Sequence, residues 1–320
     1  MKQERGWQDF DFDFLTLELI PVNFGFSPRF EEGILAENEN TKVYRDSYGV
    51  TFRIFKNGAD SMPQFLGNPV KDRKDWEKLK ERLDPHDPSR FPDNWKELVK
   101  TYQNREFPLQ LGHFPYGFFG TLRDLMGVEQ LLLSFFDQPE LIREILAYLT
   151  DFWIKLWAKI ISGVEVDVVH FWEDMCYRNG PLISPELFRE FILPCYQKMT
   201  AFARDNGIDI ITVDTDGNCW KLIPLFLEGG VTGLWPFEVR AGMDVIEVRK
   251  EFPTLQILGG INPSALSSGK KAMDQELKKM ALMLKKGGYI PFFDNDLLTD
   301  IPWENYCYFI TKQRQIIKSA

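Results

Sequence analysis

The chain has 320 residues, of which 44% are hydrophobic and 27% are charged, a globular balance that excludes wholesale disorder. It carries 38 Lys and Arg against 47 Asp and Glu, and the resulting net charge of −9 argues against a general binder of nucleic acid or of anionic membranes. Aromatic residues make up 14%, which is enough for a sizeable core and an aromatic-lined pocket besides.

Cysteine spacing and hydropathy narrow the class of protein further. The four cysteines form no C-x-x-C pair, which argues against a disulfide framework and against a structural zinc ribbon. The longest apolar stretch, around residues 145–161, is interrupted by charged residues, so no membrane span is expected. The start of the chain lacks the apolar core of a signal peptide. We therefore expect a cytoplasmic protein.

The first 106 residues form an irregular section. The segment Leu15–Phe26, which contains Glu18–Val22, is a candidate early strand, and the alternation of apolar residues from Val50 to Phe55 predicts a half-buried strand. Asp72–Leu83 predicts a charged amphipathic helix, and a shorter helix is expected near Trp95–Tyr102.

From residue 107 to residue 320 strands and helices alternate with short connections. The predicted helices begin with a long tract from residue 121 to 162 that breaks near residues 137–139, and a later helix opens at Ser184-Pro185. The predicted strands cover residues 107–113, 164–172, 208–214, 231–237, 255–258 and 289–293. This alternation predicts a parallel sheet. We expect a single α/β domain, a (β/α)8 TIM barrel with an irregular N-terminal extension, and an open doubly wound sheet is the alternative.

Polar residues follow nearly every predicted strand. In a parallel α/β fold catalytic groups lie where strands end, so these residues are the candidate site. As catalytic residues we select Glu173, Asp214, Asp216 and Glu238. As substrate-binding residues we select His113, Tyr116, Asp174, Asn218, Asp294 and Asn295. No G-x-G-x-x-G follows a strand and no P-loop motif occurs, so dinucleotide and nucleotide binding lose their usual support.

Each candidate has a structural alternative. Asp216-Gly217-Asn218 fits a turn in which Asn218 caps the next helix, and Glu173-Asp174 fits a helix N-terminal acid pair. Asp214 ends an apolar strand, where a carboxylate needs a partner or a function. His170, inside a strand, is interpreted as a hydrogen-bonded structural histidine, and Cys219 as a buried packing cysteine.

Several segments together resemble the uroporphyrinogen decarboxylase superfamily. They are Phe171-Trp-Glu-Asp-Met175, Gly180–Phe191, Asp214-Thr-Asp-Gly-Asn218, Gly259-Gly-Ile261, Gly288-Tyr-Ile-Pro291 and Glu304-Asn-Tyr306. The resemblance covers residues 100–320 well and the first hundred loosely. It implies a (β/α)8 barrel with a cleft at its C-terminal face, and a homodimer. The superfamily contains uroporphyrinogen decarboxylases and methyltransferases linked to corrinoids or coenzyme M.

The chain departs from both branches of that superfamily. In true decarboxylases two arginines of an N-terminal motif hold substrate carboxylates, and these positions fall on Phe26 and Phe30 here, with Arg29 displaced by one. Zinc methyltransferases carry His-x-Cys-Gly-Asn where this chain has Asp214-x-Asp216-Gly217-Asn218, and their late cysteine falls near Asp294-Asn295. Oxygen ligands thus replace nitrogen and sulfur ligands, which disfavours a zinc thiolate site.

Three functions remain. We favour methyl transfer from a small methylated substrate to a corrinoid carried by a partner protein, with Asp214, Asp216 and Glu238 polarising or protonating the leaving group. A divalent metal is one option, with Asp214, Asp216 and Asp294 as its oxygen ligands. A decarboxylase for another carboxylated substrate would need rim cations, of which the sequence offers Arg29, Arg123, Arg178 and Arg240. A non-catalytic ligand-binding barrel is the third, and it would pair its rim carboxylates with buried arginines.

Overall fold

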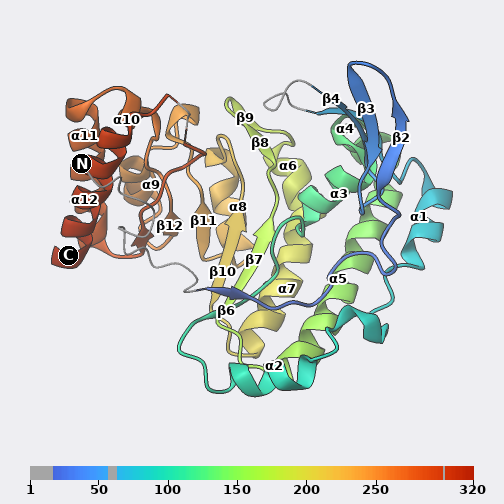
Figure 1. The fold of residues 1–320 in the computed structure, drawn as a ribbon. Coiled ribbons are helices and arrows are strands. Elements are labelled where there is room, and N and C mark those ends of the chain that lie inside the picture. The colour runs from blue at the N-terminus through green and yellow to red at the C-terminus, as the bar shows by residue number, and fades with distance from the viewer. Residues whose placement is uncertain (1–16, 57–62, 298–299) are drawn as a thin grey trace.

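The centre of the molecule is a curled parallel sheet of seven strands (Figure 1). The computed structural model describes residues 17–56, 63–297 and 300–320. The strands, in the order in which they are hydrogen-bonded, are β1 (Glu18–Leu19), β6 (Leu109–Leu111), β7 (Val168–Trp172), β10 (Ile210–Asp214), β11 (Gly233–Trp235), β12 (Gln256–Leu258) and β13 (Tyr289–Ile290). All six predicted strands after residue 106 are therefore present, and the early strand at Glu18 lies at one edge.

The predicted closed barrel is confirmed only in its coarser form, an α/β fold with a curled parallel sheet. β1 and β13 are the two edges of the sheet and are not paired with each other in the described residues. An isolated parallel bridge between Ile261 and Phe293 continues the pairing of β12 with β13. An eighth hydrogen-bonded strand and closure are not seen in the described parts of the chain.

Helices follow the strands in the predicted order and cover the outer side of the sheet (Figure 1). They are α3 (Phe118–Met126), α4 (Val128–Asp137), α5 (Pro139–Ile161), α6 (Pro185–Leu187), α7 (Leu193–Asp205), α8 (Ile223–Glu228), α9 (Val245–Glu251), α10 (Ser264–Ser267), α11 (Lys270–Lys286) and α12 (Trp303–Ser319). The tract expected as one broken helix is three helices, because Gly127 takes φ of 79° between α3 and α4. Ser184 caps α6 as predicted, its hydroxyl accepting from the amide of Leu187 at 3.2 Å.

The N-terminal section is more regular than expected. It forms a separate four-stranded antiparallel sheet of β2 (Gly33–Glu37), β3 (Thr41–Arg45), β4 (Thr51–Phe55) and β5 (Gln64–Gly67), of which only β4 was predicted. Two helices follow, α1 (Arg73–Lys80) and α2 (Trp95–Tyr102), close to their predicted ranges. A short hairpin, β8 (Cys176–Tyr177) with β9 (Gly180–Pro181), follows β7. None of the helices in the described ranges is long and apolar enough to cross a membrane.

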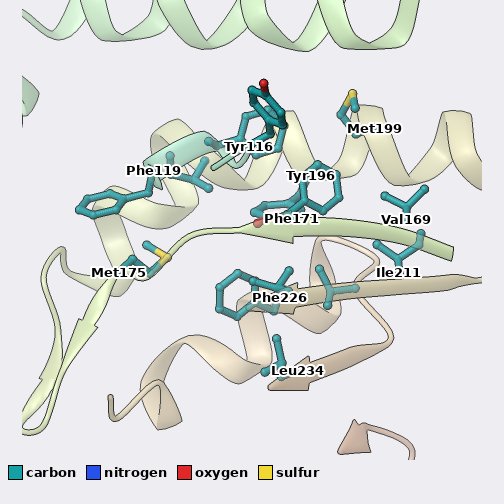
Figure 2. Close-up of a cluster of buried hydrophobic side chains, with 14 of the residues drawn as sticks. Tyr116, Phe119, Val169, Phe171, Met175, Tyr196, Met199, Ile211, Phe226 and Leu234 are labelled. Carbon is teal, nitrogen blue, oxygen red and sulfur yellow. The ribbon is translucent and has the colours of Figure 1, made fainter. Parts of the chain in front are cut away.

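Side chains alternate between the two faces of the sheet. Figure 2 shows that Phe171, Ile211 and Leu234 point from their strands toward the helices, where they meet Tyr196 of α7 and Phe226 of α8. These side chains are at most 2% exposed, so the helix-facing side is a dry core. The intervening residues of the same strands therefore face the concave side, away from the helices.

The concave face of the sheet carries polar side chains, whereas those of the helix-facing core are apolar. His170 and Thr212 occupy opposite positions on β7 and β10, and a 2.9 Å hydrogen bond joins His170 Nδ1 to the Thr212 hydroxyl. The indole of Trp235 also lies 3.4 Å from that nitrogen. Burial lowers the pKa of His170 to about 4, so the imidazole is neutral near pH 7. The hydrogen bond expected of His170 is present.

Candidate active site

The predicted site residues lie at the carboxyl edge of the sheet. Asp214 ends β10, and in the ladder it stands opposite Trp172 at the end of β7 and Trp235 at the end of β11. Because paired residues of parallel strands point to the same face, Asp214 lies between two indoles on the concave side. Each strand then turns into a loop that carries a further acid, namely Asp174, Asp216 and Glu238 in chain order.

Five carboxyl groups influence one another here, and we call Asp174, Asp214, Asp216, Glu238 and Asp294 the acidic cluster. Burial, then the negative charges of Asp216 and Asp174, raise the pKa of Asp214 to about 7. Burial, then the charges of Asp174, Glu238 and Asp294, raise the pKa of Asp216 to about 6. Burial likewise raises the pKa of Asp294 to about 6. The cluster therefore holds protons near neutrality and can donate them.

Hydrogen bonds from neighbouring loops position part of this cluster. Glu238 accepts from the main-chain nitrogen of Gly217 at 3.0 Å and from the side-chain amide of Asn295 at 2.7 Å. Asp294 is 3% exposed and accepts from the amide of Val239 at 2.6 Å. Loops from β10, β11 and β13 are therefore tied together at the site.

Asp214 and Asp216 differ from the other acids of the cluster in their hydrogen bonding. Within the described residues no protein group donates a hydrogen bond to either carboxylate. The turn given as the structural alternative is present, because Asn218 accepts from the amide of Trp220 at 3.2 Å, but it leaves the carboxylate of Asp216 without a main-chain donor. These two carboxyl groups remain available to a ligand.

Backbone geometry brings the loops close together. Gly217 has φ of 73°, and a Cβ there would lie 2.6 Å from the carbonyl oxygen of Cys176. Only glycine meets both conditions, since a side chain would clash with the hairpin after β7. Asp174 and Phe237 adopt positive φ values of 40° and 59° without being glycine. Such strain is common at functional sites.

One member of the cluster has a cationic partner. The guanidinium of Arg123, on α3, donates to the carboxylate of Asp174 at 2.7 Å and lies over the ring of Trp172, 4.7 Å from its centroid. No other carboxylate of the cluster has an ion pair in the described ranges. The predicted binding barrel, with all its rim acids paired to arginines, is therefore not what the structure shows.

Glu173 does not join the acidic cluster. Its side chain is fully buried on the helix side of the sheet, where it accepts from the amides of Phe118 and Gly120 at 2.9 Å each and from the hydroxyl of Tyr196 at 2.5 Å. Burial raises the pKa of this carboxyl. Its contacts tie the start of α3 to α7, so the structure supports a scaffold role in place of the predicted catalytic one.

Of the remaining predicted residues, some reach the acidic cluster and others hold the surrounding loops in place. Asn218 behaves as its structural alternative predicted, because its side chain accepts from the amide of Trp220 at 3.2 Å and donates to the carbonyl of Ala241 at 2.9 Å. Asn295 reaches the cluster through Glu238. His113 and Tyr116 pack edge to face, with ring centroids 5.1 Å apart, and burial lowers the pKa of His113. Cys219 is 3% exposed and burial raises its pKa to about 12, which confirms a packing cysteine.

The metal option gains no support. Within residues 17–56, 63–297 and 300–320, no three His, Cys, Asp or Glu side chains are placed to hold a metal ion together. Asp214, Asp216 and Asp294 share an electrostatic environment without forming a ligand set. We therefore derive no step through a metal.

Sequence reasoning missed Asp124. This residue of α3 lies among buried neighbours such as Leu122 and Leu125, and burial raises its pKa to about 7. In the sequence, Asp124 could have been recognised as a candidate because it is the only acid in the otherwise apolar turn that follows the loop of Tyr116.

Comparison with known proteins identifies the family. A family model described as uroporphyrinogen decarboxylase (URO-D) matches residues 45–315. The chain belongs to the uroporphyrinogen decarboxylase family. Nothing among curated proteins matches its sequence.

Solved structures support the fold of this family member. A methyltransferase from Methanosarcina mazei superposes with a TM-score of 0.57 at 18% identity, covering 84% of this chain and 76% of the other. The 3-keto-D-glucoside 4-epimerase YcjR from E. coli is also similar, with a TM-score of 0.37 at 9% identity over 77% of this chain and 93% of that one. The first of these likenesses shows a shared α/β fold, and the second is too weak to use.

Proposed function

We propose that this family member is an enzyme that transfers a methyl group from a small methylated substrate to a corrinoid carried by a partner protein. The observation that carries the proposal is the acidic cluster, in which Asp214 and Asp216 have no protein partner and have pKa values of about 7 and 6. The methyltransferase with a related fold supports it. A homodimer is part of the proposal.

The chemistry assigned to the cluster is proton donation. A methyl group bound to oxygen or sulfur leaves its electron pair on that atom when it is transferred, so the atom must gain a proton. The corrinoid of the partner would supply the nucleophile for the methyl group. Asp214, protonated below pH 7, gives its proton to the leaving atom, and burial, aided by the negative charge of Asp216, keeps the pKa of Asp214 high. The indoles of Trp172 and Trp235 would exclude water around that acid.

A decarboxylase is less well supported. Its substrate carboxylates need cations, but Arg123 is already bound to Asp174, and Arg178 and Arg240 are exposed. The acids of the cluster would repel a substrate rich in carboxylates.

The test is an anaerobic assay that follows methylation of free cob(I)alamin by absorbance, with a panel of small methyl ethers and thioethers. We expect at least one of them to methylate the cobalt. The variant Asp214→Asn should lower kcat at least 100-fold, the usual contribution of a general acid. Asp244→Asn is the matched control, since Asp244 caps α9 (Val245–Glu251) and Asn caps equally well.

Two results would overturn the proposal. One is the absence of cobalt methylation with every donor on the panel. The other is an Asp214→Asn variant that retains the rate and pH profile of the parent. Light scattering at micromolar concentration tests the dimer separately.

A further inference from the structure

Two polar residues lie on the concave face of the sheet, next to the acidic cluster and closer to the start of the strands. His170 precedes Trp172 by two positions on β7, and Thr212 precedes Asp214 by two positions on β10. Side chains two residues apart along a strand point to the same face and are about 7 Å apart. The imidazole of His170 therefore lies on the face that carries Asp214, one repeat deeper in the sheet.

The contacts of one ring nitrogen determine the tautomer of His170. The indole nitrogen of Trp235 is a donor only, so at 3.4 Å from Nδ1 of His170 it can only donate to that atom. Nδ1 must therefore be the nitrogen without a hydrogen. The hydroxyl of Thr212, 2.9 Å from Nδ1, can rotate to donate to it as well.

The opposite tautomer is disfavoured by the same indole. In that tautomer Nδ1 would donate to the hydroxyl of Thr212, which would donate in turn to the carbonyl of Val169 at 3.3 Å. Two N–H groups, of His170 and Trp235, would then face each other at 3.4 Å. The hydrogen of the neutral ring is accordingly placed on Nε2, and the ring is neutral near pH 7 because burial, aided by the charge of His113, lowers its pKa to about 4.

Nε2 of His170 has no acceptor in the described parts of the chain. The side chain as a whole is 5% exposed. Within the described ranges, however, the one fully enclosed side-chain nitrogen or oxygen without a partner is Nε of Arg249. Nε2 of His170 therefore reaches open space, where water or a ligand can accept its hydrogen.

We propose that His170 is a substrate-binding residue whose Nε2–H donates to an uncharged oxygen of the substrate, such as a carbonyl oxygen, while the methylated atom lies at Asp214. The acidic cluster would repel an anionic oxygen at this place. Arg123, which could hold an anion, is already bound to Asp174. The inference deepens the proposed function by naming a second feature of its substrate, and it rests on that function only for the position of the methylated atom.

A matched pair of small ethers probes this contact. The first is 5-methoxy-2-pentanone, in which four carbon atoms separate the ether oxygen from the carbonyl oxygen. The second is 1-methoxy-4-methylpentane, in which CH(CH3) replaces the carbonyl group. Since a carbonyl oxygen only accepts hydrogen bonds, the pair reports on a donor in the protein.

Nuclear magnetic resonance of the full chain labelled with 15N-histidine tests the tautomer and the contact without changing His170. The sequence has three histidines, so His86→Gln and His113→Gln assign the other two signals. At pH 6 we expect the Nε2–H tautomer of His170. The ketone should move the Nε2–H proton to lower field, whereas the alkyl ether should not.

Two variants of His170 then separate the donor from the shape of the side chain. The amide nitrogen of Gln can take the place of Nε2, so His170→Gln keeps a donor there, whereas the shorter Asn of His170→Asn places its amide near Nδ1. The ratio of ketone affinity to alkyl ether affinity should fall about fivefold in His170→Asn, the usual value of one hydrogen bond. In His170→Gln the ratio should stay within about twofold of the parent.

Three results would overturn the inference, namely the Nδ1–H tautomer, a ketone that leaves the Nε2–H signal unchanged, or an affinity ratio that is the same in His170→Asn and the parent. None of these measurements uses a corrinoid. A protein that shows the contact and methylates no cobalt keeps the role of His170 and loses the methyl transfer. A protein that methylates cobalt and shows the Nδ1–H tautomer loses the role of His170 alone.

Discussion

The hydroxyl of Tyr196 donates a 2.5 Å hydrogen bond to Oε1 of Glu173, in the dry layer between the sheet and α7. Two amides at the start of α3 donate to the same carboxylate. Glu173 is therefore connected to two helices through three donors, although it adjoins Asp174 of the acidic cluster in sequence. Neighbouring acids at the end of one strand have separate roles because successive side chains point to opposite faces.

Loss of the Glu173 carboxylate should reduce stability. In Glu173→Gln an amide NH2 replaces one acceptor oxygen, so at least one buried donor loses its partner, which costs about 1–3 kcal/mol. Tyr196→Phe should cost about 1 kcal/mol, the usual value of one hydrogen bond. Urea denaturation measures both.

The control for this pair is Glu228→Gln, which breaks the surface ion pair of Glu228 with Arg189. Exposed pairs contribute little, so we expect a change within about 0.5 kcal/mol. A Glu173→Gln variant as stable as this control would contradict the scaffold role of Glu173.

Asp214→Asn should raise stability at alkaline pH. The folded-state pKa of Asp214 is about 7, above its ordinary value of 3.8, so the folded chain binds more protons than the unfolded chain between these pH values. Stability therefore falls as pH rises from about 4 to about 7, and the loss is fully present above pH 7 and absent below pH 4. The shift corresponds to at most about 4 kcal/mol, and water at the site reduces this figure.

Thermal unfolding at pH 5 and pH 8 measures this effect. Asp214→Asn should unfold at a higher temperature than the parent at pH 8, with a smaller difference at pH 5. Asp244→Asn should unfold at the same temperature as the parent at both pH values, since it replaces one good helix cap with another. An Asp214→Asn variant that is less stable than the parent at pH 8 would show that the carboxylate is satisfied in the fold.

Gly217→Ala should distort the site through the backbone. A side chain at φ of 73° costs roughly 1–2 kcal/mol, and the added Cβ would also lie 2.6 Å from the carbonyl oxygen of Cys176. Gly207→Ala is the matched control, because Gly207 has φ of 81° with open space around its Cβ position. The difference in unfolding free energy between the two variants isolates the steric contact. Equal losses would mean that the loop has room to shift.

Hydrophobic periodicity predicted most of the sheet. Each strand after residue 106 was located because apolar runs end in polar residues, and neighbouring strands then follow in chain order. The N-terminal sheet was missed because β2 and β3 have mostly exposed or half-buried side chains, so the period-2 signal is weak. Closure of the barrel rests on hydrogen bonds between distant edges, which local patterns do not encode.

Part of the site was predicted because polar residues that follow parallel strands meet at one edge of the sheet. Asp214, Asp216 and Asp294 follow strands and do lie in one electrostatic environment. The structure places Glu173 on the helix side of the sheet, apart from the acidic cluster, and the sequence could not predict this because a position at the end of a strand leaves the face of the side chain open. Asp124 was missed because it lines a pocket that the distant segment Phe24–Phe26 completes, and a local sequence pattern does not reveal such a pocket.

Uroporphyrinogen should not be decarboxylated at a useful rate by this family member. The resemblance matches Phe26 and Phe30 to two arginine positions of true decarboxylases, and the rings of these two residues pack edge to face with centroids 5.7 Å apart. Phe26 is 6% exposed and lines a pocket together with Phe24, Tyr116 and Trp153. The carboxylates of the substrate would thus meet an apolar wall and lose the charge-assisted hydrogen bonds that hold them.

An anaerobic assay with uroporphyrinogen, followed by chromatography of the oxidised porphyrins, measures this activity. We expect the substrate to remain unchanged over the time in which a true decarboxylase completes the reaction. Calorimetry with the same substrate should show no binding, because the acidic cluster adds repulsion to the missing arginines. Accumulation of coproporphyrinogen would show that other cations, such as Arg29, replace the two lost arginines.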